Sequence, residues 1–203
     1  MVVDTDRVTR GHGLIEGFLA QQRARMADKL IPPAHRDGHI LDIGHGAFPL
    51  FLSQTQARGR HGVDRISEEA AIEWAKRGIH LVYQDLEQNW HLPYPDAYFS
   101  AVTMLAVFEH IASHRLVELL TEVHRVLQPG GIYVMTTPAG WTGWLLALMA
   151  RLRLVSHDEI DEHKGSYSQR EIRATMEAAG FQPGRIRTGY FEVFANNWAA
   201  ARV

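Results

Sequence analysis

Asp42-Ile43-Gly44-His45-Gly46 is the stretch that indicates the fold, because it closes a short apolar segment with two closely spaced glycines. Glycine accepts positive φ angles and has no Cβ to keep a ligand away from the backbone. Residues 39–43 form a predicted strand before the turn, and residues 48–57 form a predicted helix after it. This arrangement predicts an α/β domain in which a nucleoside-type cofactor lies against the turn.

Strand and helix patterns alternate along the chain on both sides of this turn. An amphipathic helix is expected over residues 13–30, where apolar positions recur at helical spacing. The expected strands cover 39–43, 60–64, 79–84, 98–105 and 132–137, and the helices expected between them cover 48–57, 67–77 and 113–127. Such alternation is typical of a parallel sheet with helices on both faces.

The last part of the chain departs from that alternation. Ser168 and Glu171 form a predicted capping box at the start of a helix that ends before Gly180. Two adjacent strands, 185–191 and 193–201, are expected after it as a hairpin. The expected fold class is therefore α/β, with a Rossmann-like, doubly wound, seven-stranded, mostly parallel sheet and a C-terminal antiparallel hairpin strand.

Composition excludes several classes of function. Hydrophobic residues make up 46% of the 203 residues and the formal net charge is −2, values that argue for a globular protein without a nucleic-acid partner. The chain has no cysteine, and its 12 histidines are scattered, so no metal site is expected. No signal-peptide pattern and no apolar run of about 18 residues is present, so we expect a cytoplasmic protein without a membrane span.

Ionisable and apolar residues follow the predicted strands where a ligand of such a sheet would bind. Asp64 ends the second strand and can accept hydrogen bonds from ribose hydroxyls. Asp85 and Leu86 follow the third strand, where they can face a purine. Residues 105–110 follow the fourth strand, beside the expected switch point. A nicotinamide dinucleotide is a weaker alternative, because Pro49 occupies the position of the third glycine in its fingerprint.

These segments together resemble the successive motifs of the class I S-adenosylmethionine-dependent methyltransferases, in particular the small-molecule group with a type 11-like domain. The matching segments are Ile40-Leu41-Asp42-Ile43-Gly44-His45-Gly46, Gly62-Val63-Asp64, Gln84-Asp85-Leu86, Phe99-Ser100-Ala101-Val102-Thr103 and Val107-Phe108-Glu109-His110-Ile111. Residues 122–131 resemble the helix and turn that precede the fifth strand in that group, and the likeness extends over residues 38–202.

The resemblance implies S-adenosylmethionine as the cofactor and assigns residues to its parts. The turn residues Asp42, Gly44, His45 and Gly46 would surround the methionine portion. The remaining assignments are Asp64 to the ribose, Arg65, Asp85 and Leu86 to the adenine, and Leu105 and Val107 to the floor near the sulfonium. His45 and Phe48 depart from the family's pattern, which raises the question of what their side chains do in the turn.

The resemblance also implies a single methyltransferase domain over residues 1–203. Its expected parts are an N-terminal helix in 1–34, a cofactor-binding core in 38–137, an acceptor-side insertion or lid in 138–167, and a C-terminal helix and hairpin in 168–203. Within the insertion, the apolar segment 141–155 is a candidate lid, a peripheral membrane contact or a dimer helix, and the chain is expected to be a monomer or homodimer.

The expected reaction is in-line methyl transfer to a small-molecule acceptor, with an apolar or lipid-like acceptor as one candidate. His110 and Glu109 are the candidate catalytic residues, because imidazole and carboxylate side chains can accept the proton of an acceptor hydroxyl. A simpler interpretation gives His110 a packing role only. A non-catalytic S-adenosylmethionine-binding protein of the same fold therefore stays open as an alternative.

Overall fold

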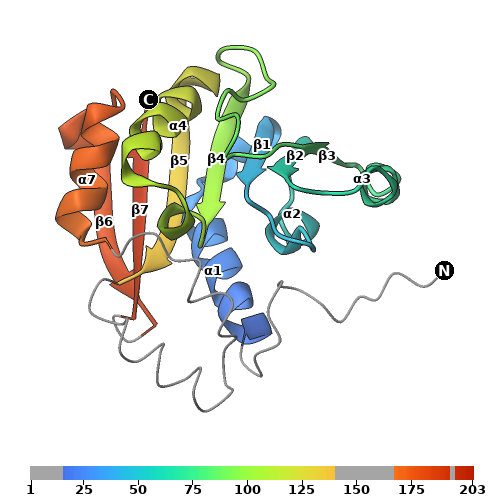
Figure 1. Cartoon of the computed structure of the whole chain (residues 1–203), viewed down its shortest axis with the longest axis horizontal. Coiled ribbons are helices and arrows are strands. Elements are labelled where there is room, and N and C mark those ends of the chain that lie inside the picture. Colours follow the sequence, from blue (N-terminus) through green and yellow to red (C-terminus); the bar gives the residue numbers. More distant parts are fainter. Residues whose placement is uncertain (1–15, 140–166, 193–194) are drawn as a thin grey trace.

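Seven β-strands form one sheet in the computed structural model, which describes residues 16–139, 167–192 and 195–203. The strands are β1 (His39–Ile43), β2 (Gly59–Asp64), β3 (Ile79–Tyr83), β4 (Phe99–Leu105), β5 (Leu127–Pro138), β6 (Ile186–Phe191) and β7 (Asn196–Arg202). Their order across the sheet is β3-β2-β1-β4-β5-β7-β6 (Figure 1). Neighbouring strands are parallel from β3 to β5, while β7 is antiparallel to β5 and β6. The predicted fold class is confirmed.

Helices cover both faces of this sheet (Figure 1). They are α1 (Glu16–Leu30), α2 (Leu50–Gln54), α3 (Glu68–Ala75), α4 (Ser113–Val126) and α7 (Gln169–Ala178), with the short 3-10 helices η1 (Pro33–Asp37), η2 (Phe108–His110) and η4 (Pro183–Arg185). One buried cluster joins the sheet to α4 and α7, and a second joins it to α1, α2 and α3. Ala101 and Val102 of β4 belong to different clusters, because successive strand residues point to opposite faces.

Helix ends follow the sequence signals closely. Ser168 accepts a hydrogen bond from the Glu171 backbone N–H, and the Glu171 carboxylate accepts one from the Ser168 N–H at 2.8 Å, which confirms the predicted capping box. Ser67 caps α3 through the Ala70 N–H at 3.2 Å. Gly180 has φ +100° immediately after α7, a backbone conformation that glycine adopts without strain.

Two element boundaries differ from the sequence prediction. The helix expected over 48–57 is only the five-residue α2, because Pro49 stands at its N-cap and disfavours helical backbone at Phe48, which lies in a turn. The fifth strand was expected to begin at Ile132, but β5 already pairs with β4 at Leu127. The pairing register then shifts across the Pro-Gly-Gly segment before it resumes at Ile132, so that segment is an irregularity within the strand.

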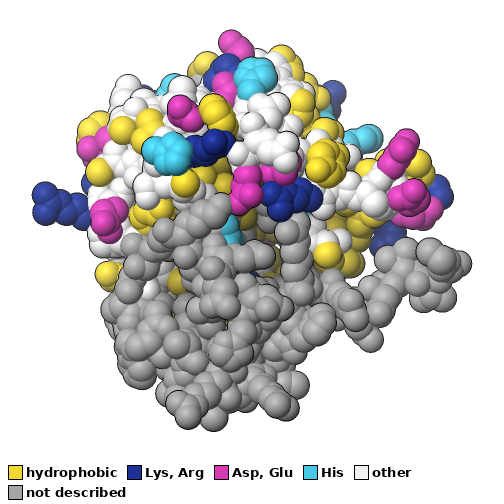
Figure 2. All heavy atoms as spheres, in the orientation of Figure 1, with side chains coloured by type: hydrophobic (Ala, Val, Ile, Leu, Met, Phe, Trp, Pro, Cys, Tyr) yellow, Lys and Arg dark blue, Asp and Glu magenta, His cyan; other side chains and the backbone are white. Residues whose placement is uncertain are grey.

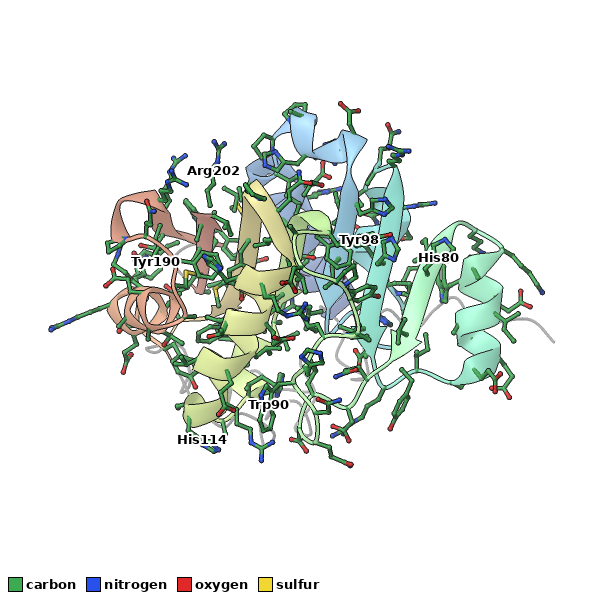
Figure 3. All side chains as sticks on the ribbon, turned by 90° about the horizontal axis from the view of Figure 1, so that it is seen from above. His80, Trp90, Tyr98, His114, Tyr190 and Arg202 are labelled. Atoms are coloured by element: carbon green, nitrogen blue, oxygen red, sulfur yellow. The ribbon has the colours of Figure 1, made fainter. Side chains whose placement is uncertain are left out.

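An irregular segment, residues 84–98, covers one face of β1 and β2. The ring of Tyr94 lies 4.8 Å from that of Phe99 and 5.8 Å from that of His61. Tyr98 also contacts His61, at 5.8 Å, and His80 continues the row of rings onto β3 at 5.5 Å from His61 (Figure 3). Aromatic packing therefore replaces a helix at this edge of the sheet.

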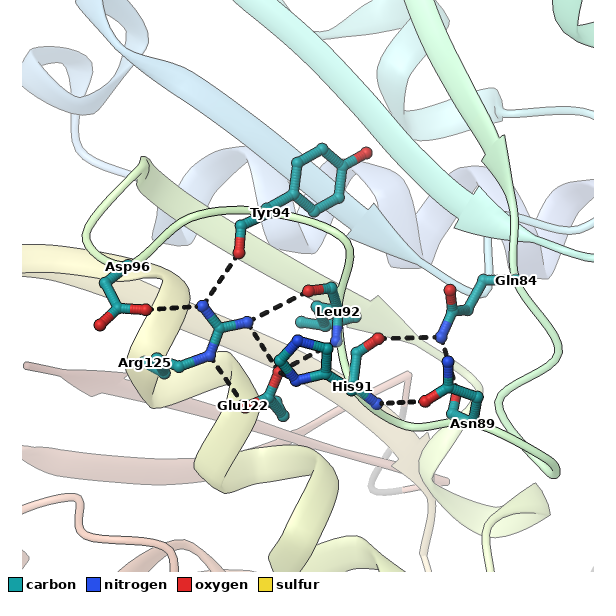
Figure 4. A network of polar contacts seen from close by, with 8 residues as sticks. All are labelled: Gln84, Asn89, His91, Leu92, Tyr94, Asp96, Glu122 and Arg125. Carbon is teal, nitrogen blue, oxygen red and sulfur yellow. Dashed lines mark hydrogen bonds and ion pairs between the residues drawn. The ribbon is translucent and has the colours of Figure 1, made fainter.

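Arg125 of α4 fastens this irregular segment to the helix (Figure 4). Its guanidinium donates to the backbone oxygens of Leu92 and Tyr94 at 3.1 and 2.9 Å. It also pairs with the carboxylates of Glu122 and Asp96, both at 2.7 Å. A planar guanidinium can satisfy several oxygens at once, so one side chain holds the course of the chain between β3 and β4.

The apolar segment 141–155 and most of the predicted insertion 138–167 lie outside the described residues. Among the helices of residues 16–139 and 167–192, none is long and apolar enough to cross a membrane. Figure 2 shows lysine and arginine side chains interspersed with acidic ones over the described part of the visible face.

Candidate cofactor-binding and active site

The site lies where the sheet order reverses direction, between β1 and β4. The parallel strands β1, β2 and β4 end at the same edge of the sheet, and the predicted residues follow these strands. Ligands of open α/β sheets bind beyond such strand ends, at the point where neighbouring connections go to opposite faces.

The glycine turn after β1 is packed tightly at one glycine and open at the other. Gly44 has φ +73°, and a Cβ there would lie 2.4 Å from Val107 Cγ2, so only glycine fits beneath Val107. Gly46 has φ +72°, and no heavy atom of the described residues lies within 4 Å of the place where its Cβ would be. The backbone at Gly46 therefore faces open space in which a ligand can approach it.

Asp64 at the end of β2 is joined to this turn by hydrogen bonds. Its Oδ2 accepts from the Gly46 N–H at 2.7 Å, and its Oδ1 accepts from the Arg65 N–H at 2.6 Å. Two backbone donors on opposite sides fix the plane of the carboxylate. The structure thus brings together Gly46 and Asp64, which lie 18 positions apart in the sequence.

The side chains of His45 and Phe48 pack into the protein around the turn. The His45 ring is buried beside β2, where a Cβ on Gly62 would lie 2.7 Å from His45 Cδ2. Its Nδ1 lies 2.8 Å from the Gly46 carbonyl oxygen, so that carbonyl can accept from an Nδ1–H. The Phe48 ring meets Trp74 of α3 edge-on at 5.0 Å. Both residues that depart from the family pattern therefore support the turn.

The helix after the turn is short. α2 has five residues, and the N–H of Leu50 donates to the Phe48 carbonyl oxygen at 2.8 Å. So short a helix has little aligned dipole. The glycine turn and the strand ends therefore offer more to an anionic ligand group than this helix does.

Arg65 and Asp85 form an ion pair across the ends of β2 and β3. The Arg65 guanidinium lies 2.9 Å from Asp85 Oδ1 and 3.1 Å from Glu87 Oε2. The guanidinium and the backbone N–H of Glu87 hold the pKa of Asp85 below its usual value. Leu86 packs against the core beside this pair. The residues assigned to the adenine are therefore neighbours, and the Asp85 carboxylate is ionised and held in place.

Asp42 is buried within the sheet just before the turn. Its Oδ1 accepts from the hydroxyl of Thr103 on β4 at 2.6 Å. Burial raises the pKa of Asp42 to about 7, which outweighs the opposite effect of the Thr103 hydrogen bond. Asp42 joins the two strands at the switch point.

The residues after β4 form a strained turn beside the glycines. Ala106 has φ +56°, an unusual angle for a residue with a side chain, and its N–H donates to the Thr136 carbonyl oxygen at 3.0 Å. On either side of it, Leu105 packs against the core on the α1 side and Val107 is buried against Gly44. Such strain persists only where the surroundings impose it, and it gathers at binding sites.

The two candidate catalytic residues lie in η2 directly after this turn. Glu109 is 2% exposed, and its Oε2 accepts from the hydroxyl of Thr137 on β5 at 2.9 Å. His110 is half-buried, and its backbone N–H donates to the Val107 carbonyl oxygen at 3.0 Å. The carboxylate is therefore held by a neighbouring strand, while the imidazole lies nearer the surface.

Tyr167 closes the other side of η2. Its ring meets that of Phe108 edge-on at 4.9 Å, and its hydroxyl lies 3.2 Å from Ser113 Oγ. The Asn197 side chain of β7 donates from Nδ2 to the Tyr167 carbonyl oxygen at 2.9 Å. Residues from η2, α4 and β7 thus converge on Tyr167.

Comparison with known proteins gives matches to methyltransferases. A family model described as a methyltransferase domain matches residues 41–135. Demethylmenaquinone methyltransferase from Symbiobacterium thermophilum is 32% identical over 127 residues, which cover 58% of this chain and 45% of that protein. The chain therefore matches less than half the length of this curated relative.

Solved structures give the same result for the fold. A SAM-dependent methyltransferase from Archaeoglobus fulgidus superposes with a TM-score of 0.67 at 17% identity, covering 92% of this chain and 94% of that one. The chain therefore has the fold of S-adenosylmethionine-dependent methyltransferases, and its residues 41–135 match a methyltransferase domain. A Haemonchus contortus phosphoethanolamine N-methyltransferase bound to S-adenosylhomocysteine also matches, with a TM-score of 0.63 and 13% identity over 90% of this chain and 52% of that one.

The geometry fits the cofactor of this methyltransferase family. The open space at Gly46 admits a ligand to the backbone, and the fixed carboxylate of Asp64 beside it can accept from paired hydroxyls. Within the described ranges no group of three or more histidine and acidic side chains is placed to hold a metal ion.

Sequence reasoning missed four residues of the site. Thr103 and Ala106 lie in segments that the sequence singled out but received no role, and Thr137 and Asn197 lie in no motif. The three polar residues lie within strands and act through partners distant in sequence. The signal for the two threonines is a polar residue within an otherwise apolar strand.

Proposed function

We propose that this chain catalyses S-adenosylmethionine-dependent methyl transfer to a small molecule with an apolar portion. The observation that carries the proposal is the carboxylate of Asp64, oriented by the N–H groups of Gly46 and Arg65 beside an open glycine turn. The relative named as a demethylmenaquinone methyltransferase supports an apolar acceptor. Aromatic rings around η2, those of Phe108 and Tyr167, support the same choice.

Different residues of the site bind different parts of the cofactor. Asp64 accepts hydrogen bonds from the ribose hydroxyls, and the Asp85 carboxylate with Leu86 lies against the adenine. The backbone of Gly46 and the side chain of Val107 line the methionine end. When bound, S-adenosylmethionine supplies a methyl group on a sulfonium, whose sulfur keeps the electrons of the C–S bond when the methyl group leaves.

The residues of η2 act on the acceptor. An acceptor hydroxyl or amine must release one proton as its oxygen or nitrogen takes the methyl group. His110, or Glu109 held by Thr137, accepts that proton. Tyr167 and Phe108 exclude water from the reacting atoms, because apolar rings cover this side of the site.

Calorimetric titration with S-adenosylmethionine, S-adenosylhomocysteine and NADH tests this function. Asp64→Ala should weaken binding of the first two by about 1–3 kcal/mol, the typical worth of hydrogen bonds to a charged group. Asp37→Ala is the matched control, since Asp37 is exposed in η1 before β1. Absence of binding of either sulfur ligand to the unaltered chain refutes the proposal, and binding of NADH alone favours the dinucleotide alternative. Binding without turnover across a panel of acceptors favours the non-catalytic alternative.

A further inference from the structure

Asn197 occupies an unusual position at the end of the sheet. It is 1% exposed, and its register partner across the antiparallel pair β5–β7 is Thr137. Directly paired residues project from the same face of a sheet, so Asn197 and Thr137 are side by side. Because Thr137 donates to Glu109, the amide of Asn197 belongs to the same buried group as that carboxylate.

One polar atom of this buried group, in the side chain of Asn197, makes no hydrogen bond with the described residues. The Nδ2 of Asn197 donates to the Tyr167 carbonyl oxygen, and this contact fixes which end of the amide is which. The Oδ1 of Asn197 is buried and has no hydrogen-bond partner among residues 16–139, 167–192 and 195–203. A buried carbonyl oxygen without a donor costs about 1–3 kcal/mol, and such atoms are rare in folded proteins. A ligand that brings a donor would remove this cost.

The surroundings restrict what that ligand can be. Asn197 Oδ1 and the carboxylate of Glu109 are both hydrogen-bond acceptors, so they suit a hydroxyl, an amine or an ammonium group. A carboxylate or phosphate would be repelled by Glu109 and would bring no donor. Phe108 precedes Glu109 in η2 and Tyr167 accepts from the Asn197 side chain, and the rings of these two neighbours suit an aromatic or other apolar body.

We propose that Asn197 is a specificity-determining residue for the methyl acceptor, and that it selects a small molecule whose apolar or aromatic body carries a hydroxyl or amine. This inference rests on the proposed function and adds to it the residue that selects the polar group of the acceptor. Thr137 acts as a positioning residue, because it holds the Glu109 carboxylate on the same face as Asn197.

Three probes that share a ring and differ in polar group test the inference: phenol, benzylamine and benzoate. Their binding to the chain saturated with S-adenosylhomocysteine is measured by ligand-observed NMR. Phenol and benzylamine should bind at least about 10-fold more tightly than benzoate, since a loss of about 1.4 kcal/mol corresponds to that factor.

Asn197→Leu should weaken phenol binding by about 10-fold while S-adenosylhomocysteine binds unchanged. Asn196→Leu is the matched control, because Asn196 precedes it in β7, projects to the opposite face and donates to Glu192 instead. Thr137→Val provides a second variant if Asn197→Leu fails to fold. It should weaken benzylamine binding, and Thr137→Ser should restore it.

The outcomes separate this inference from the proposed function. Failure of S-adenosylhomocysteine to bind refutes the function. If S-adenosylhomocysteine binds, three results overturn the role of Asn197: no binding of phenol or benzylamine, equal binding of benzoate, or equal phenol affinity in Asn197→Leu and Asn196→Leu.

Discussion

Replacing Gly44 by alanine tests the central packing contact of the site. Gly44 has φ +73°, and its added Cβ would lie 2.4 Å from Cγ2 and 3.0 Å from Cγ1 of Val107. No side-chain rotation of alanine can relieve this overlap, because the position of Cβ is fixed by the backbone. Val107 is itself buried at 8% exposure, so it has little room to move away.

The expected cost has two parts. An L-residue in the left-handed region costs about 1–2 kcal/mol. Forcing a methyl group into a filled space costs about a further 1–3 kcal/mol. Gly44→Ala should therefore lower the free energy of unfolding by about 2–5 kcal/mol. Gly46→Ala carries the first part only, since Gly46 has φ +72° and no atom of the described ranges lies within 4 Å of its Cβ position.

Urea denaturation followed by circular dichroism measures both variants. The difference between Gly44→Ala and Gly46→Ala isolates the overlap with Val107, because the two glycines have nearly the same φ. In a Val107→Ala background, Gly44→Ala should cost about as much free energy of unfolding as Gly46→Ala does, because both Cγ atoms that overlap the new Cβ are then removed. Equal costs for Gly44→Ala and Gly46→Ala, or an undiminished cost of Gly44→Ala in the Val107→Ala background, would contradict the packing argument.

Three further predictions concern stability. Asp42→Asn should gain stability relative to the unaltered chain as the pH rises from 3.8 to about 7, because burial raises the pKa of Asp42 and its protonated form is the one that the fold favours; parallel pH–stability curves would contradict this. Arg125→Met should lower the free energy of unfolding by about 2–3 kcal/mol and speed hydrogen exchange of the backbone amides in residues 84–98. Exchange as slow as in the unaltered chain would refute the role of Arg125 in holding this segment. Ser168→Ala should lower the free energy of unfolding, measured by thermal denaturation, by about 1 kcal/mol. An unchanged free energy would show that the capping box contributes nothing.

Local signals predicted the ends of several elements well. The caps at Ser67 and Ser168 and the stop at Gly180 depend on residues within one helical turn, so the sequence alone contains the information. The extent of α2 was overestimated because the apolar run after the turn resembles a longer helix. Pro49 and the packing of Phe48 on Trp74 shorten it, and only the second of these depends on tertiary contacts.

In the candidate site, too, some features follow from local sequence and others only from tertiary contacts. The sequence placed Asp64, Asp85 and Glu109 after successive strands, because strand period and turn chemistry are local properties. It could not show that Arg65 pairs with Asp85, nor that His45 turns back onto β2. These contacts depend on how neighbouring strands align.

The sequence by itself determined the α/β alternation, the glycine turn after the first strand and the resemblance to methyltransferases. The tertiary structure alone decided that Val107 covers Gly44, that Thr137 holds Glu109 and that Asn197 lies opposite Thr137 with an acceptor oxygen that meets no donor of the described residues. Each of these contacts joins segments far apart in the chain, 28 positions for Thr137 and Glu109. No local preference encodes such a contact, because it arises only when the order and register of the strands bring the two side chains together.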